Sequence, residues 1–417
     1  MKVILSHPTG NSFVRALAKE LLDAGILEAF YTSIASFPGS FFDKLARYNI
    51  FAELKRRGFD PSLQEYTKVF PFWELGRTAS IKIGATQLTK HEKGFFSLDR
   101  SYQAFDKFVA HRIARANAKN SIAVYAYEDG ALETFLSAKA LGIKCVYDLP
   151  IAYWETGRKL MNEEAIRLPE WERTLVGGVT DSPKKLQRKV RELELADIVI
   201  APSQFVVDSL PNWASSKKIV KVPFGTPIVI KDVKSREEEK KRLNRPLRIM
   251  FAGSMGQRKG LSDLFSAIKL LKGLNVELVV MGSLLTSMDF YRRELPEFIY
   301  EKGRPHAQVL ELMSTCDVFC LPSIVEGRAL VMQEAMSSRL PLIITPNTGG
   351  NDLVVEGKTG FLVPIRSPEI IAEKINWFLE NRSAVSEMGE MARRHALKYT
   401  WENYGKQIIH SLNGLFE

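Results

Sequence analysis

The fold of this chain is decided by residues 318–364, which read VFCLPSIVEGRALVMQEAMSSRLPLIITPNTGGNDLVVEGKTGFLVP. Two short, unbroken apolar runs, Val318–Leu321 and Leu342–Ile344, each end at a proline or a threonine-proline pair. Such runs are typical of strands in a parallel sheet that is covered on both faces. Between them, residues 329–336 have the composition of a helix. The stretch therefore predicts a strand–helix–strand unit of an α/β fold.

Two glutamates mark this connection, Glu326 just before the helix and Glu334 inside it. The helix start at Gly327, Ala329 and Leu330 offers free N–H groups and a positive dipole end that can receive an anion. Because a carboxylate repels phosphate, we expect Glu326 to accept hydrogen bonds from sugar hydroxyls. Eight residues of helix span roughly 12 Å, which suits a ligand with a sugar, a diphosphate and a ribose. The alternative is that Glu326 caps the helix and Glu334 is solvated.

Length and composition predict a globular protein of two domains. At 417 residues and 47.1 kDa the chain exceeds one ordinary core, and 45% of its residues are hydrophobic. The three cysteines lie in apolar runs and are expected to be buried thiols, and the six scattered histidines predict no metal site. The net charge of +10 suits nucleic acid, an anionic membrane face or acidic substrates. No nucleic-acid motif is present, so we expect no nucleic-acid partner.

Localisation is predicted from the apolar runs. The apolar run at the N-terminus is too short for a signal peptide. No apolar run in the sequence approaches the ~18 residues of a membrane span. We therefore expect a cytoplasmic protein. Residues 36–59 interleave six aromatic with five basic side chains, around a segment at 41–57. Such a segment can lie on an anionic bilayer, here the inner membrane face. The alternative is an ordinary domain helix with aromatics in the core.

The N-terminal half begins with a strand at 3–5, a turn containing Gly10 and a helix at 13–22. This order opens nucleotide-binding α/β folds, and it predicts that the backbone at Gly10 approaches a ligand; a tight turn without a ligand is the alternative. A helix at 98–118 precedes a strand at 123–127. Asp129 and Asp148 then follow two strands, at the sheet edge where open α/β sheets bind ligands. Both are candidate acceptor-side residues.

The second domain restarts with a strand at 249–251, which runs through Gly253 into Arg258 and Lys259 before a helix from 261. An arginine fork and a mobile lysine at a helix start are suited to a diphosphate; two solvated charges are the alternative. Gly282 ends the next strand. The charged, aromatic-free stretch 231–246 suits an exposed linker. Helices are expected from 368, 384 and 401.

These motifs resemble the C-terminal domain of family-4-type retaining glycosyltransferases of the GT-B fold. The resemblance is strong over 247–408 and weaker but ordered over 2–225. It departs where the family usually has an aromatic and a glycine, here Arg328 and Ala329, and where the family has an arginine, here Ser254, for which Arg258 substitutes. The matching positions are Glu326, Glu334, Pro341, Gly349, Gly350, Gly357, Gly360, Phe361, Leu362, Val363 and the pair Lys259-Gly260.

The resemblance implies two Rossmann-like parallel-sheet domains that face a cleft. They would be an acceptor-side domain at 1–228, a linker at 229–246, a nucleotide-sugar domain at 247–400, and a helix at 401–417 that returns to the first domain. It also implies that Arg258 and Lys259 hold the donor diphosphate, that Glu334 binds ribose hydroxyls, and that the backbone at Gly253 and Gly282 lies near the nucleotide.

The activity that the resemblance implies is sugar transfer, with retention and without a metal or other cofactor, from a UDP- or GDP-sugar. The acceptor would be a glycan or a lipid-linked glycan, in envelope polysaccharide or glycolipid synthesis. Two other functions fit the same architecture: a nucleotide-sugar epimerase, which would consume donor without an acceptor, and a catalytically silent nucleotide-sugar-binding protein.

Overall fold

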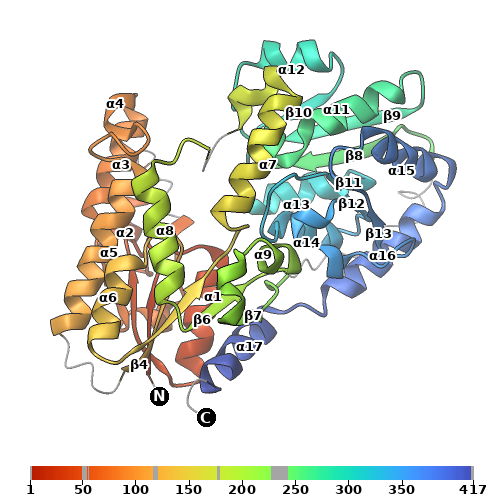
Figure 1. The fold of residues 1–417 in the computed structure, drawn as a ribbon. Coiled ribbons are helices and arrows are strands. Elements are labelled where there is room, and N and C mark those ends of the chain that lie inside the picture. Colours follow the sequence, from red (N-terminus) through yellow and green to blue (C-terminus); the bar gives the residue numbers. More distant parts are fainter. Residues whose placement is uncertain are drawn as a thin grey trace.

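The chain folds around two parallel sheets, in a computed structural model that describes residues 2–48, 54, 56–115, 121–175, 179–226 and 243–414. The predicted pair of α/β domains is confirmed (Figure 1). The N-terminal sheet has the order β3-β2-β1-β4-β5-β6-β7, and the C-terminal sheet has the order β10-β9-β8-β11-β12-β13. The strands are β1 Lys2–Ser6, β2 Leu27–Thr32, β3 Thr67–Val69, β4 Ser121–Tyr127, β5 Lys144–Asp148, β6 Ile198–Ala201, β7 Lys218–Lys221, β8 Leu247–Ala252, β9 Val276–Met281, β10 Ile299–Glu301, β11 Val318–Leu321, β12 Leu342–Ile344 and β13 Gly360–Leu362.

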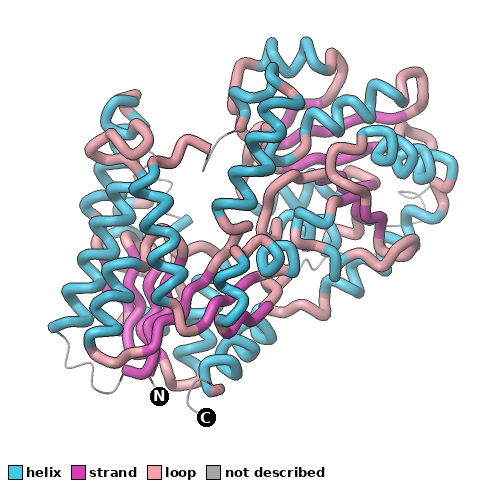
Figure 2. Tube along the Cα trace, viewed as in Figure 1, coloured by secondary structure: helices cyan, strands magenta, loops and turns pink. Residues whose placement is uncertain are grey.

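Helices enclose the strands of both sheets (Figure 2). The two strands predicted from residues 318–364 are β11 and β12, which pair in parallel, and the helix between them begins one residue late, at Leu330. The helices are α1 Ser12–Asp23, α2 Phe41–Leu45, α3 Phe72–Lys82, α4 Thr86–Thr89, α5 Leu98–Arg115, α6 Leu132–Ala140, α7 Trp154–Arg167, α8 Pro183–Leu195, α9 Gln204–Asp208, α11 Leu261–Leu270, α12 Met288–Glu294, α13 His306–Ser314, α14 Leu330–Ser337, α15 Pro368–Glu380, α16 Ala384–Ala396 and α17 Trp401–Asn413.

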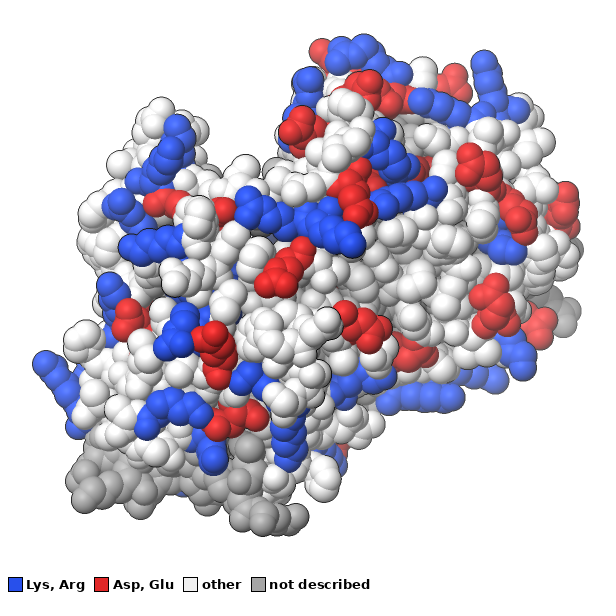
Figure 3. All heavy atoms as spheres, viewed as in Figure 1, with Lys and Arg blue, Asp and Glu red and all other residues white. Residues whose placement is uncertain are grey.

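Burial explains the strand composition. Every residue of β11 and β12 is buried, because helices cover both faces of the sheet. The N-terminal sheet likewise has one apolar cluster on the side of α1 and α17 and another on the side of α5 and α6. All three cysteines are free and buried, as predicted. The surface is hollowed between the α3–α4 end of the N-terminal domain and the C-terminal domain (Figure 3).

The last helix returns to the first domain, as expected. In Figure 1, α17 lies beside α1 at the foot of the N-terminal domain. Its buried face consists of Tyr404, Gly405, Ile408 and Leu412, which join the apolar cluster of the N-terminal sheet. The closing helix therefore ties the two ends of the chain to one core.

A second crossing joins the domains through α7 and the 3-10 helix η4, Pro169–Thr174. Trp171 of η4 is 1% exposed and belongs to the core of the C-terminal domain. Its ring packs edge-to-face on Phe265, Phe290 and Tyr291, with centroids 5.0–5.9 Å away. A side chain from the N-terminal half of the sequence thus completes the core of the other domain.

The basic aromatic segment divides between core and surface. Phe37 and Phe59 are buried, whereas Phe41 and Tyr48 are 69% and 68% exposed. The helix α2 is only five residues long, and residues 49–53 and 55 lie outside the described part of the chain, as does the predicted linker over 229–242. Membrane binding stays a prediction for the exposed aromatics alone.

Within the described ranges, no helix combines the length and the apolar character that crossing a bilayer requires.

Truncation of the α17 core contact should destabilise the protein. Ile408 is fully buried, so Ile408→Ala leaves a cavity and is expected to lower the free energy of unfolding by about 2–5 kcal/mol in urea titrations. Its neighbour Gln407 is exposed, and Gln407→Ala should change stability by no more than about 0.5 kcal/mol. Equal effects of the two variants would contradict a packed α17.

Candidate active site

The two predicted cations and the first glutamate meet at one point. Arg258 and Lys259 belong to the 3-10 helix η6, Gln257–Lys259, and both contact the carboxylate of Glu326 after β11. Lys259 Nζ lies 2.7 Å from Glu326 Oε1, and Arg258 donates to the same oxygen and, at 3.1 Å, to the carbonyl of Val325. The carboxyl ends of β8 and β11 are adjacent in the sheet, which is why these distant residues converge.

The triad is largely buried, with side chains 10–22% exposed. Burial alone would raise the pKa of Glu326, but Lys259 and Arg258 outweigh it and hold that pKa below its usual value. Burial, followed by repulsion from Arg258, lowers the pKa of Lys259, while Glu326 opposes that shift. The site therefore holds two cations against one carboxylate, and the excess positive charge suits an anion.

The triad lies where the domains touch. The N–H of Ala152, in the N-terminal domain, donates to the carbonyl of Glu326 at 3.3 Å. A Cβ added at Gly327 would lie 1.8 Å from the carbonyl oxygen of Pro150, so a side chain there would force the domains apart. Ser203, which caps α9, also donates to the carbonyl of Gly327 at 2.6 Å.

The start of α14 differs from the expected anion site in one respect. The N–H of Ala329 donates to the carbonyl of Thr348 at 3.3 Å, so it is already engaged. The side chain of Leu330 faces the N-terminal domain, where it lines a large cavity. Among the expected phosphate-binding groups, the cation pair and the remainder of the helix start therefore stay candidates.

Glu334 has a partner that the sequence analysis missed. His306 Nε2, at the start of α13, lies 3.2 Å from Glu334 Oε1. Burial raises the pKa of Glu334, and His306 opposes that shift. The residues are separated by a strand and a loop in sequence, so no local pattern predicts the contact. Together they form a polar pair in the middle of α14, about one helical turn after its start.

Arg328 turns away from the donor side of the site. It is 3% exposed and donates to Gln333 Oε1 at 3.0 Å, the carbonyl of Gly349 at 3.1 Å and Asp352 at 2.7 Å. Its guanidinium lies over the ring of Tyr399. The departure from the family pattern at this position therefore fills a structural role beneath the helix start.

Gly253 and Gly282 lie back to back at the ends of β8 and β9. A Cβ on Gly282 would lie 1.7 Å from the carbonyl oxygen of Gly253, and Gly253 itself has φ +153°. The backbones are thus packed too closely for a side chain at Gly282, whether or not a nucleotide binds there. A nucleotide contact at these glycines stays a prediction.

Gly10 lies in the N-terminal domain at the edge of the cavity that Leu330 also lines, about 1170 Å³ in volume. Its φ of +60° and a Cβ position 2.5 Å from Phe59 make glycine necessary at this turn. The N–H groups of Thr9 and Gly10 donate to His7 Nδ1 at 3.0 and 2.9 Å. The predicted first loop therefore borders a ligand-sized space.

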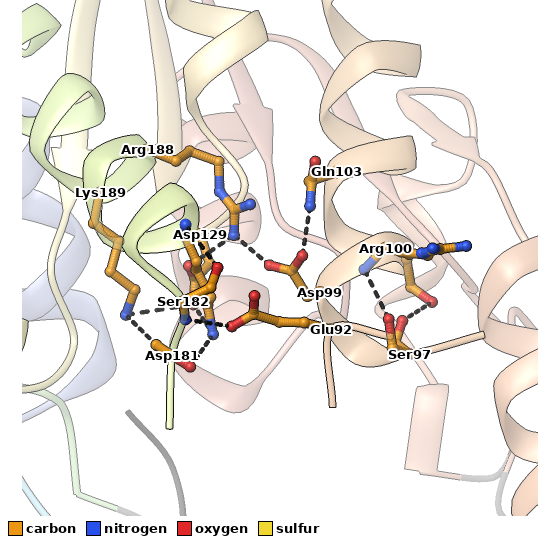
Figure 4. Close-up of polar contacts among 12 residues, drawn as sticks. Glu92, Ser97, Asp99, Arg100, Gln103, Asp129, Asp181, Ser182, Arg188 and Lys189 are labelled. Atoms are coloured by element: carbon orange, nitrogen blue, oxygen red, sulfur yellow. Dashed lines mark hydrogen bonds and ion pairs between the residues drawn. The ribbon is translucent and has the colours of Figure 1, made fainter. Parts of the chain in front are cut away.

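Asp129 is held in an ion-pair cluster (Figure 4). Arg188 reaches both Asp129, at 3.1 Å, and Asp99, and Lys185 and Lys189 lie 3.6 and 3.5 Å from Asp129. Burial would raise the pKa of Asp129, but these cations, led by Lys189, lower it. Its carboxylate is engaged by protein cations from α8.

Asp148 lies inside the N-terminal domain, 1% exposed. The hydroxyl of Tyr125 donates to it at 2.5 Å, and Tyr127 is a second partner. Burial raises the pKa of Asp148 to about 7, and the two tyrosines oppose the shift. The structure does not bring Asp148 or Asp129 into contact with the triad, so their acceptor-side roles stay predictions.

A second buried network joins the domains and was not predicted. Glu164 of α7 is fully buried and accepts from Arg167, Arg366 and Gln257 at 2.6, 2.5 and 2.7 Å. Arg167 and Gln257 also donate to Asp263 at 2.8–2.9 Å. Gln257 directly precedes the cation pair, so this network fixes the loop that presents Arg258 and Lys259.

The glycine pair provides a stability test. Gly282→Ala forces the Gly253 carbonyl to move and should lower the free energy of unfolding by about 1–3 kcal/mol in urea titrations. Nothing lies within 4 Å of the corresponding position at Gly303, so Gly303→Ala is the control and should be near neutral. A neutral Gly282→Ala would show that the two turns are not packed together.

The pKa of Asp148 predicts a pH dependence. Because the native pKa of about 7 exceeds the ordinary value of 3.8, the native state retains a proton that the unfolded state releases between these values. The stability of the wild type relative to Asp148→Asn should therefore fall as pH rises from 4 to 7, by on the order of 4 kcal/mol. Urea unfolding at several pH values measures it, and parallel curves would contradict the buried carboxyl.

Part of the chain is similar to known glycosyltransferases. Residues 233–395 match the family model described as glycosyl transferases group 1. The capsular polysaccharide biosynthesis glycosyltransferase CapM of Staphylococcus aureus is 31% identical over 215 residues, which cover 48% of this chain and 54% of that protein. The D-inositol 3-phosphate glycosyltransferase of Corynebacterium glutamicum (strain R) is 26% identical over 253 residues, 55% of this chain and 60% of that protein. The chain thus spans less than two thirds of either relative.

Solved structures match over the whole chain. Anabaena HepE in complex with UDP superposes with a TM-score of 0.62 at 16% identity, covering 99% of this chain and 100% of that one. Sucrose-phosphate synthase from Thermosynechococcus elongatus superposes with a TM-score of 0.66 at 16% identity, covering 100% of this chain and 99% of that one. The chain therefore has the two-domain GT-B glycosyltransferase fold, and residues 233–395 carry its match to the glycosyl transferases group 1 family.

Proposed function

We propose that this protein is a retaining, metal-independent glycosyltransferase that moves a sugar from a nucleotide-diphosphate donor to an acceptor hydroxyl. The observation that carries the proposal is the buried triad of Arg258, Lys259 and Glu326 at the domain junction. Two cations at one buried point can stabilise the diphosphate that leaves when the glycosidic bond breaks. The match of residues 233–395 to the glycosyl transferases group 1 family model supports a glycosyltransferase activity.

The triad also indicates what holds Arg258 and Lys259 in place before the donor binds. Without donor, Glu326 forms ion pairs with both cations. An arriving diphosphate competes for Arg258 and Lys259, and Glu326 then turns to accept hydrogen bonds from sugar hydroxyls. Glu334, in the middle of α14, and its partner His306 hold the ribose of a UDP- or GDP-sugar.

Retention follows from attack on the leaving-group face. The acceptor oxygen forms a bond to the anomeric carbon as the bond from that carbon to the phosphate oxygen breaks, and the phosphate takes the acceptor proton. This route requires no protein nucleophile, because the cation pair stabilises the departing charge. The acceptor is a glycan or a lipid-linked glycan, in envelope polysaccharide or glycolipid synthesis on the cytoplasmic side of the membrane.

Nucleotide release from a panel of UDP-, GDP- and ADP-sugars tests the proposal. The wild type should release nucleotide from one donor, slowly by hydrolysis and faster with acceptor. Glu326→Ala should slow release on the order of 100-fold, because it loses the sugar contact. The same change frees Arg258 and Lys259 from their carboxylate, so affinity for the nucleoside diphosphate alone should not fall. Calorimetric titration measures that affinity.

Glu373, exposed on α15, supplies the control: Glu373→Ala should behave as wild type in both assays. Release that is independent of Glu326 would overturn the assignment. Conversion of the donor to its epimer without nucleotide release would indicate an epimerase, and nucleotide binding without turnover in the presence of acceptor would indicate a silent binder.

A further inference from the structure

The cavity of about 1170 Å³ between Gly10 and Leu330 has a lining of mixed character. It borders both the first loop of the N-terminal domain and the residue at which α14 begins, so a molecule inside it approaches the donor site. Among its described lining residues are five cations and one carboxylate: Arg15, Arg56, Arg57, Arg77, Lys82 and Glu74.

The single carboxylate of the lining, Glu74, is shared by two arginines. Glu74 is 4% exposed and accepts from Arg57 at 2.7 Å and from Arg77 at 2.9 Å. Arg15 donates to the carbonyl of Gly10 at 2.9 Å, and burial together with repulsion from Arg57 lowers its pKa. Guanidinium groups therefore crowd the loop end of the cavity with more positive charge than Glu74 neutralises. Arginine forks in this arrangement match phosphate oxygens.

The remainder of the lining is apolar. Leu45, Leu54, Leu75 and Ile34 line the space, and Phe41 and Ile83 belong to the same lining with 69% and 77% exposure. A wall of this kind, continuous with exposed apolar side chains, suits a hydrocarbon chain that extends out of the cavity. A purely sugar ligand would leave this surface without a partner.

We propose that the cavity binds the acceptor as a lipid phosphate: its phosphate or diphosphate lies on Arg15, Arg56 and Arg77, and its hydrocarbon chain runs along Leu75 and Phe41. This inference rests on the proposed function, which it deepens by choosing the lipid-linked class of acceptor. The glycan that this lipid phosphate carries then places its acceptor hydroxyl on the side of Leu330 and Gly10, toward the donor. A water-soluble acceptor would use neither the apolar wall nor the exposed rim.

Binding of three probes separates the two halves of the site. Farnesyl diphosphate carries both features, farnesol only the chain, and inorganic phosphate only the anion. Calorimetric titration below the micellar concentration should show that farnesyl diphosphate binds the full-length protein at least about tenfold more tightly than either fragment. Farnesol that binds as tightly as farnesyl diphosphate would overturn the role of the arginines. Inorganic phosphate that binds as tightly would indicate a water-soluble phosphorylated acceptor and overturn the role of the apolar wall.

Variants locate the site. Arg56 is exposed, so Arg56→Gln should fold normally, and it should weaken farnesyl diphosphate binding roughly tenfold, as expected for the loss of one charge-assisted contact. Phe41→Ser should weaken farnesyl diphosphate several-fold and leave inorganic phosphate binding unchanged. The exposed Lys93 lies outside the cavity lining, and Lys93→Gln is the matched control for loss of charge. Equal effects of Arg56→Gln and Lys93→Gln would indicate attraction by net charge alone and overturn the site.

Different results would overturn the transferase proposal and the lipid acceptor proposal. If wild type releases nucleotide in a Glu326-dependent manner but does not bind farnesyl diphosphate, the transferase stands and the lipid acceptor is wrong. If farnesyl diphosphate binds but nucleotide is released from no donor, either alone or with a glycan or lipid-linked glycan acceptor, the cavity is a lipid phosphate site and the transferase proposal is wrong.

Discussion

The close approach of two backbones at Gly327 and Pro150 is the constraint on which the rest of the site depends. With no side chain at Gly327, the loop after β11 lies directly on the N-terminal domain, and the carbonyl of Glu326 accepts a hydrogen bond from Ala152. The apolar cluster around Ile324, Val325 and Met161 packs the same junction. The triad of Arg258, Lys259 and Glu326, the start of α14 and the cavity of the N-terminal domain are neighbours because this loop joins them.

Charge at the junction is arranged in two layers. The inner layer is Glu326 between Arg258 and Lys259, and the outer layer is Glu164 with Arg167, Arg366 and Gln257. Buried ions cost free energy unless they are paired, so each layer keeps its partners close. The outer layer holds Gln257, which directly precedes the cation pair, through Glu164 and Asp263. The inner layer has two cations for one carboxylate.

Much of the fold could be predicted from local sequence. The apolar runs predicted β11 and β12, and the turn after the first strand predicted the start of α1. The convergence of Arg258 with Glu326 follows from their places at the carboxyl ends of parallel strands. The rest depends on contacts between segments far apart in the chain. Thr348 occupies the N–H of Ala329, and His306 finds Glu334, through tertiary packing that leaves no periodic signal. Composition likewise could not separate Phe59, which is buried, from Phe41, which is exposed.

The burial of Trp171 has a consequence for how this architecture can be recombined. Its indole comes from the N-terminal half of the sequence but fills the core of the C-terminal domain, against Phe265 and Phe290. The boundary that matters for modular exchange therefore does not coincide with the stretch between the two sheets. A chimera of two relatives that is joined near residue 228 would keep Trp171 of one parent inside the C-terminal core of the other. An exchange that carries η4 together with the C-terminal half would keep Trp171 with the core that it fills.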